Sequence, residues 1–521
     1  MIVPIRPCDI PGVPEKYDSW RLYQKATVEQ LVEWLPSSFV TCLDAPTGVG
    51  KSLVAIAIAG LLKLKTVYVV STLQLQTQLA GDFPKAAVIW GRDNYRCLRG
   101  HGRTAADCAH EANVNPCLHI VECPYRLAKA AAKASQIAVV NYAYFLTECN
   151  FVGEFSGWPL VVLDEADVVE KELMHFVSLK LRFTQIDECG LKFPDKKDTL
   201  DGWVAWATES ADRVAMRCQM LEYDAGEFED GIIPRDLLDD LKKYSSLLSK
   251  LRVFISCVDD TWVTNFTDTF YEWKPTMVDR YAERFVFKHG KKFMAMSATM
   301  PTGKRWTSNL GLQEAPFVRV NSPFPKGNRP IIDLHIANFS RKKIEGGQVL
   351  HSAVEAIDAL LRIHANDKGL IHTQSYVLAQ FVMNNSQYAD RMITHNNSDE
   401  KEEALQSLFE APGPKVLVSP SMTRGVDLCG DRAGFQIIIK VPYLDLGDKQ
   451  IYRRRHLPNG EDWYLDETAH QLVQMCGRII RSEQDKKPTY ILDSRFWAFW
   501  EQAAERGSLP RWFLEAINRW K

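Results

Sequence analysis

The sequence has 521 residues, of which 46% are hydrophobic and 25% charged, and its formal net charge at pH 7 is −2. These values are typical of a folded globular protein of three or four domains, and they argue against one that binds polyanions over its whole surface. The N-terminus lacks a basic flank followed by an apolar stretch, and no apolar run is long enough to span a bilayer. We therefore expect a cytoplasmic protein without a membrane segment, whose 12 cysteines are thiols or metal ligands.

A phosphate-binding loop is predicted near the N-terminus. A buried strand at residues 39–44 runs into Ala-Pro-Thr-Gly-Val-Gly-Lys-Ser at residues 45–52, and an apolar helix follows. The glycines allow backbone N–H groups to turn toward phosphate oxygens. Lys51 would supply positive charge to the β- and γ-phosphates, and Ser52 a hydroxyl ligand for Mg²⁺. The ATP-binding residues predicted in this loop are Pro46, Thr47, Gly48, Val49, Gly50, Lys51 and Ser52.

Four cysteines follow between positions 97 and 123, a segment so short that chance would place fewer than one of the 12 there. Structural zinc sites usually use paired C-x₂₋₄-C knuckles, and none occurs here. Thiolates from loops and short helices can instead converge on an iron–sulfur cluster. Three roles therefore remain possible for these cysteines at this point: ligands of an iron–sulfur cluster, ligands of zinc, or unligated thiols. The residues are Cys97, Cys108, Cys117 and Cys123.

An acidic box, Asp-Glu-Ala-Asp at residues 164–167, ends the apolar run at residues 160–163. Such a run is typical of a central parallel strand, at whose carboxyl end ligands bind in open α/β sheets. Asp164 would hold Mg²⁺, directly or through water, and Glu165 would polarise the attacking water as general base. Alone, these acids could form a solvated loop; the preceding phosphate loop favours a nucleotide site.

The long segment between the acidic box and Ser297 contains three predicted helices, at 200–221, 237–253 and 276–285. A segment of this length inside a compact lobe indicates an inserted domain, as does the segment 53–163 between the phosphate loop and the acidic box. The second insertion is rich in tryptophan. These side chains could stack on nucleic-acid bases, but in amphipathic helices they are more often part of the core, which we favour for Trp203, Trp206, Trp262 and Trp273.

Near the C-terminus, Gln474, Arg478 and Arg481 are spaced by four and three residues, which would place them on one face of a helix. Two guanidinium groups suit the charge that develops on a γ-phosphate during transfer, the role of an arginine finger. A surface helix with solvated arginines is the alternative. The distance along the chain from the phosphate loop implies a second lobe that closes over ATP.

The order of these motifs resembles that of superfamily 2 helicases, and five further segments fit the same series, at 21–24, 71–78, 297–299, 369–375 and 423–427. The resemblance implies that Gln24 reads adenine. It adds to the nucleotide site, as residues that couple the lobes, Gly425 and Asp427. It assigns nucleic-acid contact or coupling to Thr72, Gln78, Ser297, Thr299, Thr373, Gln374 and Thr423.

The phrases G-R-x-N-Y-x-C, C-P-Y and V-V-N-Y, which begin at Gly91, Cys123 and Val139, are similar to the XPD/DinG group of iron–sulfur helicases. The resemblance implies single-stranded or forked DNA as the partner, 5′-to-3′ movement, a monomeric motor, and ATP and Mg²⁺ as cofactors. Asp167 departs from the group, whose close bacterial members commonly have His there. In this group, four cysteines ligate a [4Fe–4S] cluster, which the resemblance assigns to Cys97, Cys108, Cys117 and Cys123.

The expected fold is α/β, with two RecA-like P-loop lobes that contain parallel sheets, an inserted iron–sulfur domain and a mainly helical arch insertion. Lobe 1 is expected in three pieces, separated by the two insertions, with lobe 2 after them. The expected boundaries are 1–92 (lobe 1, first part), 93–130 (iron–sulfur domain), 131–167 (lobe 1, continued), 168–288 (arch), 289–325 (lobe 1, end) and 326–521 (lobe 2).

Two other functions remain open. An RNA-dependent ATPase of the DEAD-box kind is favoured by Asp167 but disfavoured by the long insertions and the cysteine segment. A nucleotide-dependent adaptor without unwinding activity is disfavoured by the presence of Lys51, Glu165 and Arg478, which a non-hydrolysing protein would not need.

Overall fold

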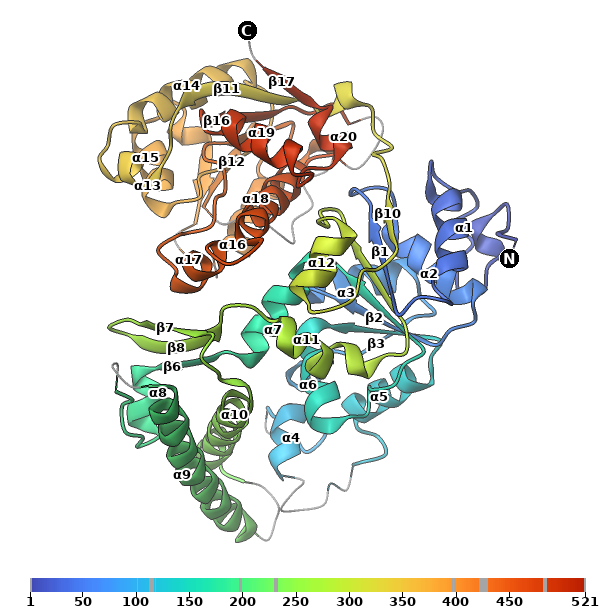
Figure 1. The fold of residues 1–521 in the computed structure, drawn as a ribbon, viewed down its shortest axis with the longest axis vertical. Helices are drawn as coiled ribbons and strands as arrows, with labels where there is room; N and C mark the ends of the chain where they lie inside the picture. The colour runs from blue at the N-terminus through green and yellow to red at the C-terminus, as the bar shows by residue number, and fades with distance from the viewer. Residues whose placement is uncertain are drawn as a thin grey trace.

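The computed structural model describes residues 2–100, 102–111, 117, 119–195, 199–228, 233–395, 397, 400–420, 430–480 and 485–519 (Figure 1). Four predicted site residues lie outside these ranges, namely Thr423, Gly425, Asp427 and Arg481. Within the described part of the chain, no helix has both the length and the apolar character needed to cross a bilayer.

Lobe 1 is built on a seven-stranded parallel sheet in the order β10-β1-β9-β5-β2-β4-β3. Its central strands are runs of apolar and β-branched residues because helices cover both faces. The strands are β1 (Val40–Asp44), β2 (Thr66–Val70), β3 (Ala87–Val88), β4 (Ile137–Asn141), β5 (Leu160–Asp164), β9 (Phe293–Ser297) and β10 (Phe317–Arg319). The helices of this lobe are α1 (Gln24–Trp34), α2 (Lys51–Leu61), α3 (Leu73–Asp82), α5 (Pro124–Ala134), α6 (Tyr142–Thr147), α7 (Val169–Val177) and α12 (Gly303–Asn309).

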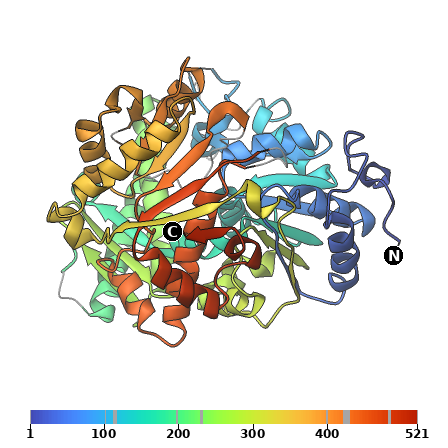
Figure 2. The same ribbon diagram turned by 90° about the horizontal axis from the view of Figure 1, so that it is seen from above.

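Lobe 2 repeats this architecture with a second seven-stranded parallel sheet, in the order β13-β14-β12-β15-β16-β11-β17 (Figure 2). The prediction of two α/β lobes with parallel sheets is confirmed. The strands are β11 (Ile331–Ala337), β12 (Gly369–His372), β13 (Met392–Thr394), β14 (Val416–Ser419), β15 (Phe435–Ile438), β16 (Thr489–Asp493) and β17 (Ile517–Arg519). The helices are α13 (Arg341–Glu345), α14 (Leu350–Ile363), α15 (Tyr376–Asn385), α16 (Lys401–Glu410), α17 (Lys449–Arg455), α18 (Gly460–Cys476), α19 (Phe496–Glu505) and α20 (Arg511–Leu514).

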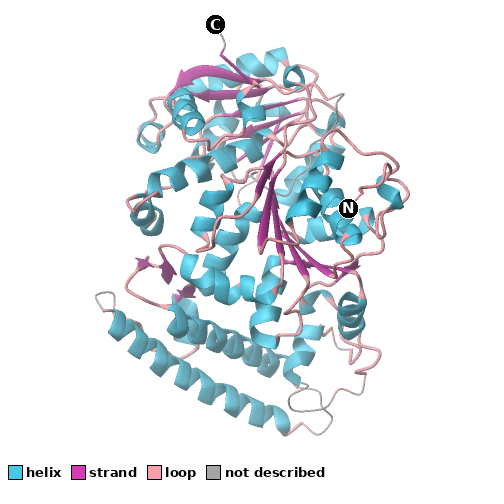
Figure 3. Cartoon of the chain, turned by 45° about the vertical axis from the view of Figure 1, so that its right-hand side comes forward, coloured by secondary structure: helices cyan, strands magenta, loops and turns pink. Residues whose placement is uncertain are grey.

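The insertion after α7 contains two long helices that lie side by side and the short helices α8 (Phe183–Glu188) and α11 (Asp279–Phe285) (Figure 3). The long helices are α9 (Leu200–Gly226) and α10 (Arg235–Cys257), which confirms the two longest predicted helices. The sequence interpretation missed a three-stranded antiparallel sheet in the order β6-β8-β7. Its strands are β6 (Leu179–Arg182), β7 (Trp262–Phe266) and β8 (Phe270–Pro275).

The tryptophans of this insertion belong to its core, as favoured from the sequence. Trp262 and Trp273 lie in strands rather than helices, and along β8 the side chains alternate between buried and partly exposed. Trp273 is fully buried and stacks on Trp206 from α9, with ring centroids 5.2 Å apart. Trp203 is partly buried against the same core. The rings of Trp206, Trp262 and Trp273 are therefore buried and are not displayed on the surface for base stacking.

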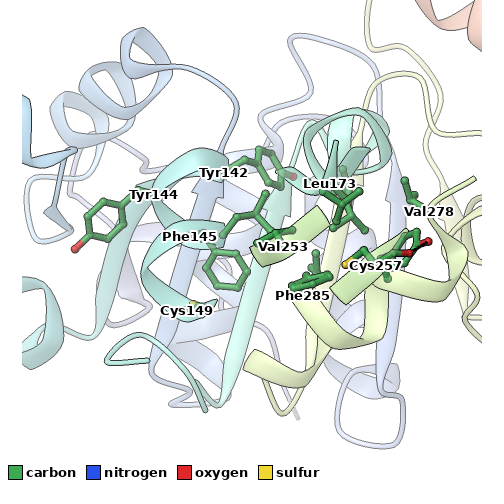
Figure 4. Close-up of a cluster of buried hydrophobic side chains, with 14 of the residues drawn as sticks. Tyr142, Tyr144, Phe145, Cys149, Leu173, Val253, Cys257, Val278 and Phe285 are labelled. Atoms are coloured by element: carbon green, nitrogen blue, oxygen red, sulfur yellow. Dashed lines mark hydrogen bonds between the residues drawn. The ribbon is translucent and has the colours of Figure 1, made fainter. Parts of the chain in front are cut away.

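The insertion shares its hydrophobic core with lobe 1. Side chains from α6 and α7 of the lobe and from α10 and α11 of the insertion form one cluster (Figure 4). Phe145 and Leu173 contribute from the lobe, and Cys257 and Phe285 from the insertion. The continuous packing means that the base of the insertion moves with lobe 1 rather than as a loosely tethered module.

The cysteine segment contacts the insertion through α4 (Ala105–Glu111), which packs beside α10. Asp107 of α4 is almost fully buried and forms ion pairs with Lys242 and, at 3.4 Å, with Arg235. Burial opposes ionisation of this carboxyl group, but its hydrogen bonds with the Lys242 ammonium and the Thr104 N–H lower the pKa of Asp107 overall. These ion pairs connect the two inserted segments.

Candidate nucleotide site between the lobes

A cavity of about 480 Å³ lies between the two lobes. Residues from both contribute to its walls, since Gln474 and Arg478 of lobe 2 face the phosphate loop of lobe 1. The predicted site residues that line the cavity are Gln24, Thr47, Gly48, Gly50, Lys51, Ser52, Gln78, Asp164, Glu165, Ser297, Gln474 and Arg478. Segments from near the two ends of the chain thus meet around one space.

The phosphate loop connects β1 to the first turn of α2, which begins at Lys51. Gly48 and Gly50 have φ angles of 87° and 83°, in the left-handed region that glycine adopts without strain. The Lys51 ammonium donates a hydrogen bond to the carbonyl of Ala45 at 3.0 Å. Backbone N–H groups at the start of α2 and the lysine charge together make this loop a site for anionic phosphates.

Gln24 supports the phosphate loop through hydrogen bonds of its side-chain amide. Its Nε2 donates to the carbonyl of Val49 at 2.6 Å, and its Oε1 accepts from the N–H of Arg21 at 2.8 Å. The Arg21 guanidinium reaches the same loop and donates to the carbonyl of Gly48 at 2.9 Å. Both ends of the Gln24 amide therefore contact backbone, so in this conformation the residue positions the loop, and its role in adenine recognition stays a prediction.

The acidic box is held by hydroxyl groups from neighbouring elements. Asp164 Oδ2 accepts from the hydroxyl of Tyr68 at 2.9 Å, and the Tyr142 hydroxyl donates to the Asp164 backbone carbonyl at 2.8 Å. The Glu165 carboxylate accepts a short hydrogen bond from Ser71, and its backbone lies in the left-handed region with φ of 50°. Burial raises the pKa of Asp164, while Lys51 and Tyr68 oppose that shift. The sequence interpretation did not predict these hydroxyl contacts. The one feature of the sequence that could have indicated them is the presence of polar residues within or just after apolar strands.

A hydrogen-bond network crosses from one lobe to the other. Asp167 accepts from Ser297 Oγ at 2.6 Å and, through its other oxygen, from Gln474 Nε2 at 2.9 Å. The Gln474 amide also lies 3.5 Å from Thr299 Oγ1. The acidic box, the Ser-Ala-Thr segment and α18 of lobe 2 therefore share one buried polar cluster, in which the carboxylate of Asp167 serves as a double acceptor.

The predicted helical face that would carry Gln474 and both arginines is wrong in part. Helix α18 ends at Cys476, so Gln474 is helical but Arg478 follows the helix end. Gly477 is the C-cap residue, and a glycine favours termination because it stabilises a helix poorly. A Cβ on Gly477 would lie 3.2 Å from Thr47 Oγ1, so the turn passes directly against the phosphate loop. Arg478 is 9% exposed and lines the cavity despite leaving the helix.

Three of the residues assigned to nucleic-acid contact or coupling, Thr72, Thr373 and Gln374, contact groups within their own lobe. Thr72 caps α3 by accepting from the N–H of Leu75 at 3.2 Å. The Thr373 hydroxyl is buried and donates to the carbonyl of Ser375 at 3.0 Å. Gln374 contacts the Met475 sulfur of α18 at 3.5 Å, and Gln78 faces the nucleotide cavity. Of these residues, Gln78 lies at the cavity between the lobes.

Two of the predicted cluster cysteines, Cys97 and Cys117, lie near enough to a third, Cys108, to influence the pKa of its thiol. Burial, together with the neighbouring Cys97 and Cys117 thiols, raises the pKa of Cys108 to about 12. Cys97 is 7% exposed, and Cys123 immediately precedes α5. In the described ranges, no group of three or more His, Cys, Asp or Glu side chains is arranged to hold a metal ion. The donor set, four thiols, is nevertheless the one that iron–sulfur clusters use.

Comparison with known sequences finds a matching family in each lobe. Residues 18–167 match the family described as type III restriction enzyme, res subunit, and residues 357–515 match that described as helicase C-terminal domain. A probable ATP-dependent helicase of Methanocaldococcus jannaschii is 29% identical over 220 residues, which are 38% of this chain and 34% of that protein. A Caenorhabditis elegans homolog of regulator of telomere elongation helicase 1 is 22% identical over 130 residues, 22% of this chain and 13% of the relative. The chain thus spans about a third or less of these relatives.

Solved structures match over nearly the whole chain. An XPD helicase superimposes with a TM-score of 0.67 at 16% identity and covers 96% of this chain and 99% of its own. The Xpd4 protein of S. tokodaii gives 0.60 at 15% identity, with coverage of 96% and 100%. At these identities the likeness concerns the fold alone. Because the match covers 96% of this chain, it includes both lobes and the insertions.

Proposed function

Because the chain belongs to the superfamily 2 helicases with an XPD-like fold, we propose that it is an ATP-dependent DNA helicase or translocase. The observation that carries the proposal is the cavity between the lobes, where Lys51 and Glu165 of one lobe face Arg478 of the other. Such a site is sensitive to the γ-phosphate, because a nucleotide that contacts both walls favours closure of the lobes and its hydrolysis releases them. Movement along a nucleic acid follows if the lobes hold the strand differently in the two states.

Each side chain has a defined task in this scheme. Lys51 neutralises the phosphate charge, Glu165 orients and polarises the attacking water, and Arg478 stabilises the charge that develops on the transferred group. Ser52 and Asp164 present hydroxyl and carboxylate oxygens, the ligands that Mg²⁺ prefers, so they would hold this ion beside the phosphates. The bound ion would neutralise phosphate charge further. The chemistry is therefore positioning and charge neutralisation, without a covalent intermediate.

The cysteine segment is proposed to hold a [4Fe–4S] cluster as a structural element. The adjacency of Cys97, Cys108 and Cys117 supports this assignment, as does the resemblance to the XPD/DinG group. Cys123 would provide the fourth thiolate. Because α4 is tied to α10 by the ion pairs of Asp107, a rigid cysteine segment would also fix the end of the arch insertion against it.

Single-stranded or forked DNA and 5′-to-3′ movement are proposed by analogy with the same group. The competing RNA-dependent ATPase would use the same nucleotide site, so the substrate must be distinguished by experiment. An adaptor that binds nucleotide without hydrolysing it would not need a general base. The presence of Glu165 at the cavity therefore disfavours this alternative.

The direct test compares ATP hydrolysis and strand separation on matched substrates. Phosphate release is measured with no nucleic acid, with single-stranded DNA and with RNA of the same sequence, and unwinding is followed on 5′-tailed and 3′-tailed forks. We expect stimulation by DNA, unwinding of the 5′-tailed fork, and loss of both in Glu165→Gln, while ADP binding is retained. Stimulation by RNA alone would favour the RNA-dependent ATPase, and nucleotide binding without turnover would favour the adaptor.

A further inference from the structure

Tyr68 occupies an unusual position for a tyrosine. It lies in the middle of β2, a central strand of the lobe 1 sheet, and is fully buried among the apolar residues beneath α2. Strand β2 pairs with β5, which ends at Asp164, and Tyr68 is in register with Val162 of that strand. The ring therefore fills the core while its hydroxyl reaches the edge of the sheet where the acidic box begins.

The hydroxyl of Tyr68 contacts one of the two groups that would hold Mg²⁺. It donates its single proton to Asp164 Oδ2 at 2.9 Å. Ser52, the other group, lines the same cavity as Asp164. The other oxygen of Asp164, Oδ1, accepts from the N–H of Glu165 at 2.9 Å, which fixes the rotation of the carboxylate.

From this geometry we propose that Tyr68 is a positioning residue for the magnesium site, holding the Asp164 carboxylate in the orientation in which it can coordinate the ion beside Ser52. The proposal rests on the function proposed above only in naming ATP and Mg²⁺ as the ligands. A tyrosine that merely filled the core could be replaced by phenylalanine without consequence, because the ring would remain. The hydroxyl is what the site uses.

Substitution Tyr68→Phe isolates the hydroxyl. The measurement is isothermal titration of ADP at a series of MgCl₂ concentrations and in its absence, with a melting curve of each protein. We expect the half-saturating Mg²⁺ concentration to rise about tenfold, since the variant loses a hydrogen bond to a charged group. The affinity for ADP without Mg²⁺ should change by less than about twofold, because Lys51 and the loop backbone are untouched.

Tyr281→Phe is the matched control. That hydroxyl is also buried, accepting from Trp262 Nε1 and donating to the Cys257 carbonyl, both at 2.8 Å, but it lies in the arch insertion. Wild-type Mg²⁺ dependence in Tyr68→Phe would overturn the inference, as would an equal loss of ADP affinity with and without Mg²⁺. Because this readout requires no ATP turnover, failure of the inference and failure of the proposed helicase function can be told apart.

Discussion

The nucleotide cavity and the cysteine segment position their functional side chains in different ways. In the cavity, Asp164 ends the central strand β5 and Glu165 follows it, and both carboxylates are held by hydroxyls from the adjacent strand β2 and the turn after it. In the cysteine segment, Cys97 and Cys108 approach each other from a loop and a short helix that is secured by the ion pairs of Asp107. The protein alone can therefore preorganise the first site, whereas the second should depend on the group that its thiols bind.

The largest effect is expected from removing one thiol of the cysteine segment. In Cys108→Ser, bound iron should fall at least about tenfold and the visible absorbance of the purified protein should disappear, because a cuboidal cluster needs its four ligands. The change is measured by metal analysis and an absorption spectrum. ADP affinity should stay within about twofold, because no described residue of the cysteine segment contributes to the lining of the nucleotide cavity.

Cys218→Ser provides the control for this prediction, since Cys218 is a buried cysteine in α9 and outside the proposed ligand set. It should retain its iron. Iron retained in Cys108→Ser, or zinc found in place of iron in the wild-type protein, would contradict the cluster assignment.

The contribution of lobe 2 to catalysis in the cavity can be tested by substituting Arg478. In Arg478→Ala, ATP hydrolysis should fall by about a thousandfold, because an arginine finger acts on the charge of the transition state. ADP affinity should change by less than about threefold. The comparison is single-turnover hydrolysis against equilibrium binding, with Arg362→Ala, an exposed arginine at the end of α14, as the control that keeps the wild-type rate. A parallel loss of binding and hydrolysis would assign Arg478 to general nucleotide affinity instead.

A smaller effect is expected where the lobes are held together. Arg454 of α17 is 2% exposed, forms an ion pair with Glu170 of α7 and lies over the Trp463 ring at 4.0 Å. Burial lowers the pKa of Arg454 to about 9. Glu170→Ala would remove the ion-pair partner of this buried cation, leaving only the more remote charge of Glu467, and should reduce the free energy of unfolding by about 3 kcal/mol in a denaturant titration.

The exposed pair Arg455–Glu461 offers the matched comparison. Its atoms are 2.6 Å apart, but the side chains of Arg455 and Glu461 are 31% and 40% exposed, so Glu461→Ala should cost about 0.5 kcal/mol. Equal losses in the two variants would show that the contact between α7 and α17 does not secure the lobes.

The sequence predicted the parts of the site that depend on local patterns. The phosphate loop, the strands at 66–70 and 160–163 and the two long helices of the insertion follow from apolar runs and their periodicity. The β6-β8-β7 sheet was missed because its strands are short and flank long helices, although residues 270–275 do alternate in burial. Those strands could have been predicted only from the alternation of apolar and polar residues, in a region whose other segments favour helix.

Other features depend on tertiary contacts and could not be read from spacing. Arg478 reaches the cavity from a turn because Gly477 ends α18. The helical spacing therefore predicted correctly that Arg478 lies at the nucleotide cavity, but wrongly that it does so from a helix. The engagement of Gln24 by Val49 and the bridge from Tyr68 to Asp164 each join segments that are distant along the chain. Only the folded lobe brings such groups within hydrogen-bonding distance.

The most direct test of the two-walled cavity is trapping with ADP, Mg²⁺ and aluminium fluoride, which mimics the transferred phosphoryl group. Wild-type protein should retain one ADP per chain after gel filtration, whereas Arg478→Ala should bind ADP alone with wild-type affinity but fail to trap it with fluoride. Equal trapping by the two proteins would contradict the account, because the second lobe would then contribute nothing to the reacting phosphate.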